Sequence, residues 1–217
     1  MKLIVFFLSL LLLLNWSCSS DDSGETGTLA IIGYSQSIVQ IPFFTDGSTA
    51  APNIDWNGDV GLFSIQNAVQ GTSIDFNTGV VSWNSSLPVG TNNITVLAVN
   101  SAGAASTTIQ IANNFEGVFV GTIDFFEIDP VPATFIFDND GTSTFHIGNS
   151  PPSLPASWNL QGNIIRSQYI FDDDPGPFFI EGTLTNTEME AYIEGRYGTD
   201  ISDGASFGIF RIDLIDP

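Results

Sequence analysis

Carboxylates are the side chains in this sequence that could carry out acid–base chemistry. Aspartate and glutamate together number 24, against one histidine, His146, and one cysteine, Cys18. Glycoside hydrolysis needs two carboxyl groups roughly 5–10 Å apart, and Glu181, Glu190 and Glu194 fall on neighbouring expected strands. In a chain this acidic, such a pair is expected by chance. We therefore expect no enzyme, and a carboxylate-dependent hydrolase is the third of three functional hypotheses.

The densest acidic run is Asp172, Asp173 and Asp174, between Phe171 and Pro175. Adjacent negative charges repel one another unless a cation or solvent lies between them, and calcium takes oxygen ligands of this kind. The run predicts either a weak calcium site or a solvated loop. Apart from calcium, we expect no cofactor.

The remaining acidic segments are typical of turns. The run Asp138-Asn139-Asp140-Gly141 is interpreted as a hairpin tip, because Ile136 stands where an EF-hand loop needs its first aspartate ligand. Four further aspartates lie scattered in the first half of the chain, and for them turn solvation is preferred over a calcium site. These are Asp46, Asp55, Asp59 and Asp75.

Aromatic side chains in the second half of the chain are the candidate ligand contacts. A binding site would place them along a concavity, whereas a purely structural protein would bury all of them in its core. The candidates are Trp158, Tyr169, Tyr192 and Tyr197.

The start of the chain predicts export and lipid attachment. Lys2 precedes an apolar run from Leu3 to Leu14, which is shorter than the roughly 20 residues of a membrane-spanning helix and is typical of a secretory signal. The segment Asn15-Trp16-Ser17-Cys18 resembles the lipobox of bacterial lipoproteins, although Asn15 stands where an aliphatic residue is usual. The resemblance implies that residues 1–17 are a signal peptide and that diacylated Cys18 anchors the chain to the membrane.

Residues 18–27 are small, polar and acidic, which predicts a flexible tether. The serines followed by Asp21 and Asp22 resemble the signal by which some Gram-negative bacteria move lipoproteins to the outer face of the outer membrane. An ordinary solvated linker is the alternative. We expect a cell-envelope protein, anchored to the outer membrane and facing the exterior.

Composition excludes one class of partner. The formal net charge is −20, and the basic residues beyond the signal are three separate arginines. Phosphate backbones need a basic footprint, so nucleic acid is not expected to bind. The abundance of phenylalanine, valine, isoleucine and threonine, with frequent glycine and proline, predicts an all-β chain.

Between residues 28 and 113, seven or eight short apolar runs alternate with turn residues. This pattern predicts a β-sandwich. The strings Ser73 to Trp83, Leu87 to Thr91 and Ile94 to Gly103 resemble the immunoglobulin-like, cadherin-like repeats of bacterial surface proteins. The resemblance implies that Asn77-Thr78-Gly79 forms a tight turn and that Trp83 fills the sandwich core.

Residues 115–217 predict a second, acidic module of eight strands in meander order, which suits a closed antiparallel barrel. Its glycine placement and aromatic spacing, as in Gly117 to Gly121 and Gly208 to Ile212, loosely resemble the lipocalin-like domains of bacterial lipoproteins. The polar boundary at Asn113-Asn114 predicts that the two modules fold independently.

Together these features favour a binding or adhesion module for a glycan or a small apolar ligand. A structural spacer within an envelope assembly is the second hypothesis. An open, aromatic-lined cavity in the second module would favour binding over a spacer.

Overall fold

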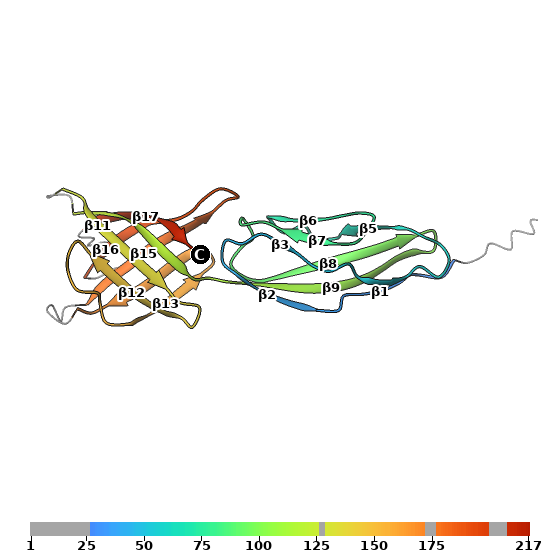
Figure 1. The fold of residues 1–217 in the computed structure, drawn as a ribbon, viewed down its shortest axis with the longest axis horizontal. Coiled ribbons are helices and arrows are strands. Elements are labelled where there is room, and N and C mark those ends of the chain that lie inside the picture. Colours follow the sequence, from blue (N-terminus) through green and yellow to red (C-terminus); the bar gives the residue numbers. More distant parts are fainter. Residues whose placement is uncertain (1–26, 126–128, 172–176, 200–207) are drawn as a thin grey trace, which may run out of the picture.

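The computed structural model describes residues 27–125, 129–171, 177–199 and 208–217, and every regular element within them is a β-strand. Figure 1 shows a β-sandwich and a closed barrel arranged end to end. The prediction of an all-β chain, with a sandwich followed by an antiparallel barrel, is confirmed.

The sandwich is built from short strands and one long hairpin. Its strands are β1 (Ile31–Gly33), β2 (Ile38–Pro42), β3 (Gly47–Ser48), β4 (Asn53–Asp55), β5 (Leu62–Ile65), β6 (Thr72–Ile74), β7 (Val81–Trp83), β8 (Gly90–Asn100) and β9 (Gly103–Asn114). One sheet has the order β2-β9-β8-β5 and the other β3-β7-β6, with β1 and β4 forming a separate pair. Strand β2 runs parallel to β9, and the other pairs are antiparallel.

The sandwich core follows from the alternation of side chains along its strands. Ile94, Val96 and Ala98 of β8 are fully buried, whereas the residues between them face outward. Trp83 of β7 is buried in the same core, as the sequence implied.

Two turns in the sandwich have the geometry expected from their sequences. Strand β8 ends at Asn100, and the hairpin returns at Gly103, whose φ is 133°. In the other turn, the Asp75 carboxylate accepts hydrogen bonds from the backbone N–H groups of Asn77 and Thr78, and Gly79 has a φ of 72°. Both positions need glycine, because other residues are strained at positive φ.

Eight strands form the barrel. They are β10 (Gly117–Asp124), β11 (Val131–Phe137), β12 (Thr142–Ile147), β13 (Ala156–Gln161), β14 (Ile164–Tyr169), β15 (Phe178–Asn186), β16 (Ala191–Gly198) and β17 (Gly208–Asp216). Each strand pairs with the next, and β10 also pairs with β17 to close the barrel. Closure gives every strand a neighbour on both sides, although β12 and β13 pair at only two positions. All eight predicted strands are present.

The barrel interior is filled by aromatic rings. Phe135 stacks on Phe145 with ring centroids 4.4 Å apart, and it also stacks on Phe210 at 5.5 Å. Gly182 faces Gly195 across the β15–β16 pair, and a side-chain carbon at Gly182 would lie 3.0 Å from the Phe210 ring. Because Gly182 has no side chain, the Phe210 ring can pack against it in the core.

Candidate functional site

The four aromatic candidates do not come together at one site. Tyr169 is fully buried and Tyr197 nearly so, and both belong to the barrel core. Tyr192 lies on the outer wall, where the Arg211 guanidinium carbon is 3.8 Å from its ring centre. Trp158 is half-buried and lies at the end of the barrel that meets the sandwich. Trp158 borders a hollow that residues of both modules line, whereas the other three line none of the hollows found among the described residues.

The Tyr169 phenol shows how strongly the barrel core excludes water. Burial raises its pKa to about 12 from an ordinary 10.0. Ser143 and Ser167 lie close enough to the hydroxyl to oppose this rise, but neither is placed to form a hydrogen bond with it. Tyr169 is therefore a core residue, not a ligand contact.

The three glutamates considered for hydrolysis lie on the outer wall and are paired with arginines. Glu181 accepts hydrogen bonds of 2.8 Å from both Arg166 and Arg196, while Glu194 pairs with Arg211 at 2.8 Å and Glu190 with Arg211 at 3.8 Å. Partial burial tends to raise the pKa of Glu181, but the two arginines outweigh it and hold that pKa below its ordinary value. A general acid needs the opposite shift.

Shallow hollows of about 380 and 280 Å³ border this wall beside Glu194 and Ile209. Except for Asp124, the charged side chains that line them are paired with one another in the ion pairs just described. The wall therefore offers a ligand few unpaired polar groups.

One motif was missed in the sequence. Gly204-Ala205-Ser206-Phe207-Gly208 has the Gly-x-Ser-x-Gly spacing of a serine nucleophile elbow. That elbow requires a turn from a strand into a helix, whereas here the string leads into strand β17. Residues 204–207 lie outside the described ranges.

The single histidine, His146, lies on β12, where its backbone pairs opposite Thr134.

The predicted calcium and lipid sites, Asp172 to Asp174 and Cys18, lie outside the described residues. The four scattered aspartates of the first module all accept backbone hydrogen bonds. Asp55 and Asp75 each accept one from the residue two positions ahead, whereas Asp46 accepts from Ser85 N–H and Asp59 from Ser101 N–H, both at 2.7 Å. Within the described ranges, histidine, cysteine, aspartate and glutamate form no group of three suited to a metal. The described residues also include no helix long and apolar enough to cross a membrane.

The sandwich inserts an aromatic side chain into the end of the barrel. Phe43, in the loop after β2, is fully buried within the barrel's core cluster, together with Phe115 from the linker between modules. The ring centre of Phe43 lies 5.1 Å from that of Phe115 and 6.5 Å from that of Phe119. The boundary is thus more apolar than Asn113-Asn114 alone indicated, while the independent folding of the modules stays a prediction.

A hydrogen-bonded contact joins the modules on a second side. The Asn186 amide donates to the carbonyls of Ser85 and Leu87 at 3.2 and 3.1 Å. Ser85 Oγ donates to Glu188 O at 3.0 Å, and Asn84 Nδ2 donates to the Glu188 carboxylate at 2.8 Å. We call this set of bonds the strap. With the Phe43 insertion, it fixes the two modules at two separate points.

Between these points lies a cleft with two basins, which we call the junction cleft. The Trp158 basin has a volume of about 360 Å³ and is lined by Val89, Gly90, Asn113, Asn114, Phe115, Asn139, Trp158, Leu160 and Gly162. The Asn186 basin has a volume of about 440 Å³ and is lined by Gln70, Pro88, Val89, Gly162, Asn163, Leu184, Thr185 and Asn186. Both volumes fall within the roughly 300–1,000 Å³ of small-ligand sites.

Trp158 is held in place before any ligand arrives. Its indole N–H donates to the Asp138 carbonyl at 3.1 Å. Its ring meets Phe115 edge-on at 5.2 Å and Phe137 at 6.3 Å, with interplanar angles of 77° and 90°. A half-buried indole fixed in this way supplies a large, rigid contact surface for a ligand.

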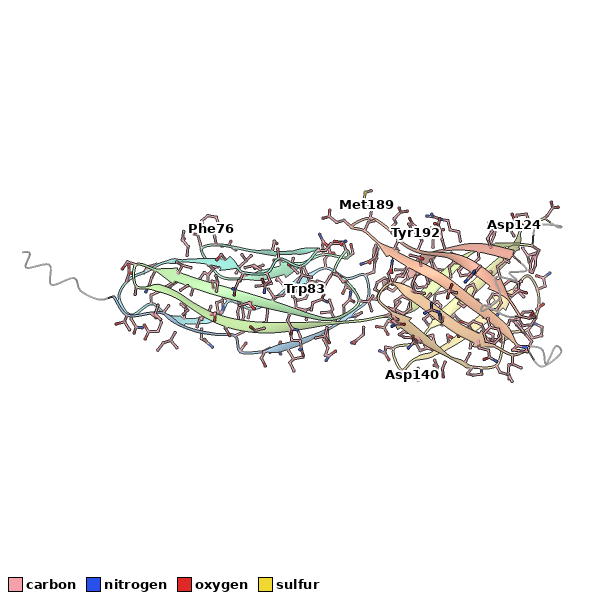
Figure 2. The ribbon with its side chains drawn as sticks, turned by 180° about the vertical axis from the view of Figure 1, so that it is seen from behind. Phe76, Trp83, Asp124, Asp140, Met189 and Tyr192 are labelled. Atoms are coloured by element: carbon pink, nitrogen blue, oxygen red, sulfur yellow. The ribbon has the colours of Figure 1, made fainter. Side chains whose placement is uncertain are left out.

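The Asp138–Gly141 turn supports this arrangement. It joins β11 to β12 as a hairpin tip, as predicted, with the Asp138 carbonyl accepting from Gly141 N–H at 3.0 Å. Thr142 donates to the Asp140 carboxylate through its hydroxyl at 2.7 Å and its backbone N–H at 2.9 Å. These bonds hold the pKa of Asp140 below its ordinary value, so it stays charged. Figure 2 places Asp140 at the barrel end nearest the sandwich.

Sequence reasoning found Trp158 but not the amides that share its cleft. Asn113, Asn114 and Asn139 come from the linker and from a turn, and they were interpreted as boundary and turn residues.

Comparison of the chain with protein-family models, with curated proteins and with solved structures finds no match of any of the three kinds. The junction cleft therefore has to be interpreted from its own geometry.

Proposed function

We propose that this protein is a lipid-anchored cell-envelope protein that acts as a non-enzymatic binding module, with a glycan bound in the junction cleft. The observation that carries the proposal is the fixed, half-buried Trp158 beside amide side chains in a hollow that both modules line. Sugars present apolar ring faces edged by hydroxyl groups, and an indole with neighbouring amides complements both.

A small apolar ligand, the other half of the original hypothesis, finds less support. The place for it would be the barrel interior, as in lipocalins, which enclose one small ligand. Here Phe119, Phe135, Phe137, Phe145 and Phe210 occupy that interior and are all buried. The junction cleft, with its polar lining, is the better candidate.

The anchor and the fold resemblances belong to the same proposal. Diacylation of Cys18 would hold the protein on the outer membrane, with residues 18–27 as tether and the immunoglobulin-like sandwich as the arm that carries the lipocalin-like barrel. Residues 1–26 precede β1 in the sequence, and β1 lies at the sandwich end remote from the barrel (Figure 1). The junction cleft would then stand away from the membrane and face the exterior.

A glycan array tests the proposal. The mature chain, labelled with a fluorophore at its amino terminus, should retain a subset of glycans, and Trp158→Ala should lose that subset. Tyr192→Ala is the matched control, because it removes a half-buried aromatic from the outer wall. An array with no retained glycan, or equal retention by Trp158→Ala, would reject the proposed function.

The two-point joint favours a spacer as the second candidate function. Phe43 and the strap fix the barrel relative to the sandwich, as a rigid spacer would require. If the array shows no glycan while small-angle scattering shows a rigid, extended particle, the spacer hypothesis takes its place.

A further inference from the structure

We propose that the junction cleft binds an uncharged, linear oligosaccharide that runs through both basins and across Gly162. The inference rests on the proposed binding function and names the ligand class of the same site. It draws on the charge of the cleft, its two-basin shape and a buried amide with an unpaired oxygen.

The lining of the cleft is free of charge in a strongly acidic protein. Among the residues that line either basin, none is aspartate, glutamate, lysine, arginine or histidine, although the chain has 24 acidic residues. Six of them carry side-chain amides instead. Each amide can both donate and accept hydrogen bonds, as can each hydroxyl group of a sugar, so a neutral polyol matches the lining.

Negative charges surround the cleft without entering it. Asp138 and Asp140 flank Asn139 at the Trp158 basin, and Glu188 lies two residues beyond Asn186 at the other basin. Hydrogen bonds from Thr142 keep Asp140 ionised, and the whole chain adds a net charge of −20. Like charges repel, so an anionic glycan would meet repulsion at both ends.

The shape of the cleft points to a chain of sugars. The two basins are separate hollows that share Val89 and Gly162 in their linings, so they adjoin at the Gly162 turn. Gly162 has a φ of 63°, and no atom lies within 4 Å of where its side-chain carbon would be. The ridge between the basins is therefore low and open. A single sugar in one basin would leave the other unused, whereas a linear oligosaccharide fills both.

A buried amide supplies an independent sign of a ligand. Asn113 lines the Trp158 basin and is only 2% exposed. Its Nδ2 donates to the Leu87 and Pro88 carbonyls at 2.8 and 3.3 Å, but its Oδ1 finds no donor within the described residues. A buried acceptor left unpaired is unfavourable. Oδ1 is almost fully covered in the unliganded structure, so a sugar hydroxyl in the basin would supply the missing donor only after the surrounding wall shifts.

Isothermal titration of the full mature chain tests the inference. The probes are a neutral glucan series of mono-, di-, tetra- and hexasaccharides in α-1,4 and β-1,4 linkage, with an α-1,4-linked hexauronate as the anionic counterpart. Two variants separate the basins: Asn139→Ala for the Trp158 basin and Asn163→Ala for the Asn186 basin. Both side chains are exposed and make no hydrogen bond within the described residues, so the fold should be unaffected. Gln36→Ala, an exposed amide away from the cleft, is the control.

We expect the hexasaccharide of one linkage to bind at least tenfold more tightly than its disaccharide. Each single variant should weaken hexasaccharide binding by about tenfold, the effect of one lost hydrogen bond, and Gln36→Ala should leave it unchanged. The disaccharide, which fits one basin, should respond to only one of the two variants.

The outcomes test the two-basin, neutral-ligand inference separately from the proposed glycan-binding function on which it rests. Equal affinities for disaccharide and hexasaccharide, or an unaffected Asn163→Ala variant, would overturn the two-basin site while leaving glycan binding at Trp158 intact. Tighter binding of the hexauronate would overturn the neutral ligand class. No binding of any probe, combined with an array that Trp158→Ala does not change, would reject the proposed function itself.

Discussion

Phe43 of the sandwich packs edge-on against Phe115 of the linker, with ring centroids 5.1 Å apart and the rings inclined at 61°. Phe44, the next residue, has a φ of 59°, a conformation that bulky residues rarely adopt. Such backbone conformations cost on the order of 1–3 kcal/mol. The buried Phe43 side chain offsets this strain, so the joint between the modules is a specific tertiary contact.

Phe43→Ala should destabilise the barrel although Phe43 belongs to the sandwich. Removing a fully buried phenylalanine costs about 3–5 kcal/mol, and the cavity would open beside Phe115 and Phe119. Denaturant unfolding followed by tryptophan fluorescence, to which Trp56 and Trp83 of the sandwich and Trp158 of the barrel all contribute, measures the loss. The segment 115–217 expressed alone lacks Phe43 and should melt at a lower temperature than the barrel in the full chain. Equal melting temperatures would show that the insertion adds nothing to barrel stability.

Gly195→Ala should strongly destabilise the barrel. A side-chain carbon at Gly195 would lie 2.2 Å from the Glu181 carbonyl oxygen and 2.5 Å from Gly182 Cα, both backbone atoms that cannot move aside separately. We expect a loss of more than about 2 kcal/mol, within the range for overpacking. Gly33→Ala is the matched control in a strand, because nothing lies within 4 Å of its side-chain position. A Gly195→Ala melt equal to the parent would contradict the close approach of β15 and β16.

Stability should fall at high pH because of Tyr169. Burial raises its folded-state pKa to about 12, above the ordinary 10.0, so the folded state retains a proton that the unfolded state loses. Its contribution is complete below pH 10 and is lost as the pH rises toward 12. Tyr34, which donates to the Gly79 carbonyl, has its pKa raised to about 12 by burial and acts in the same direction.

Unfolding free energies at pH 9 and pH 11.5 check this expectation. Tyr169→Phe removes the titrating group, so its stability should decline less between the two values. An identical decline in the parent and the variant would mean that Tyr169 does not titrate in this window.

Cys18→Ala should abolish membrane retention without changing the melt of the folded modules. The anchor is proposed to be covalent lipid, and two acyl chains give stable attachment where one gives only marginal binding. Labelled palmitate and membrane fractionation measure the two parts of the expectation. Palmitate incorporation by Cys18→Ala at the level of the parent would remove the lipid proposal.

Calcium should raise the melting temperature if Asp172 to Asp174 form a site. An ion bound only to the folded state at about ten times its Kd stabilises it by about 1.4 kcal/mol. Magnesium should do less, since it gives up its water reluctantly and requires stricter geometry. The triple variant with asparagine at these positions should lose the calcium effect. If calcium leaves the melting temperature of the parent unchanged, Asp172 to Asp174 are a solvated loop and not a calcium site.

Local patterns were the part of the fold that the sequence predicted well. Apolar alternation located the barrel strands, and turn residues ending in glycine located the hairpins at Gly103 and Gly141. The two-residue strand β3 was missed, because Gly47–Ser48 carries no apolar signal and its pairing with β7 arises only when the sheets assemble. Tyr169 and Tyr197 could not be told from ligand contacts, since an aromatic ring has the same pattern at the core and at a cleft.

What the sequence determined by itself was the all-β class and the order of a sandwich followed by a barrel, because strand period and turn chemistry act over a few residues. The tertiary structure alone decided that Phe43 enters the barrel, that the strap ties Asn186 to Ser85, and that Asn113, Asn139 and Trp158 face one cleft. These residues come from segments far apart in the chain. Their meeting depends on how two completed modules pack against each other, and no local pattern records that packing.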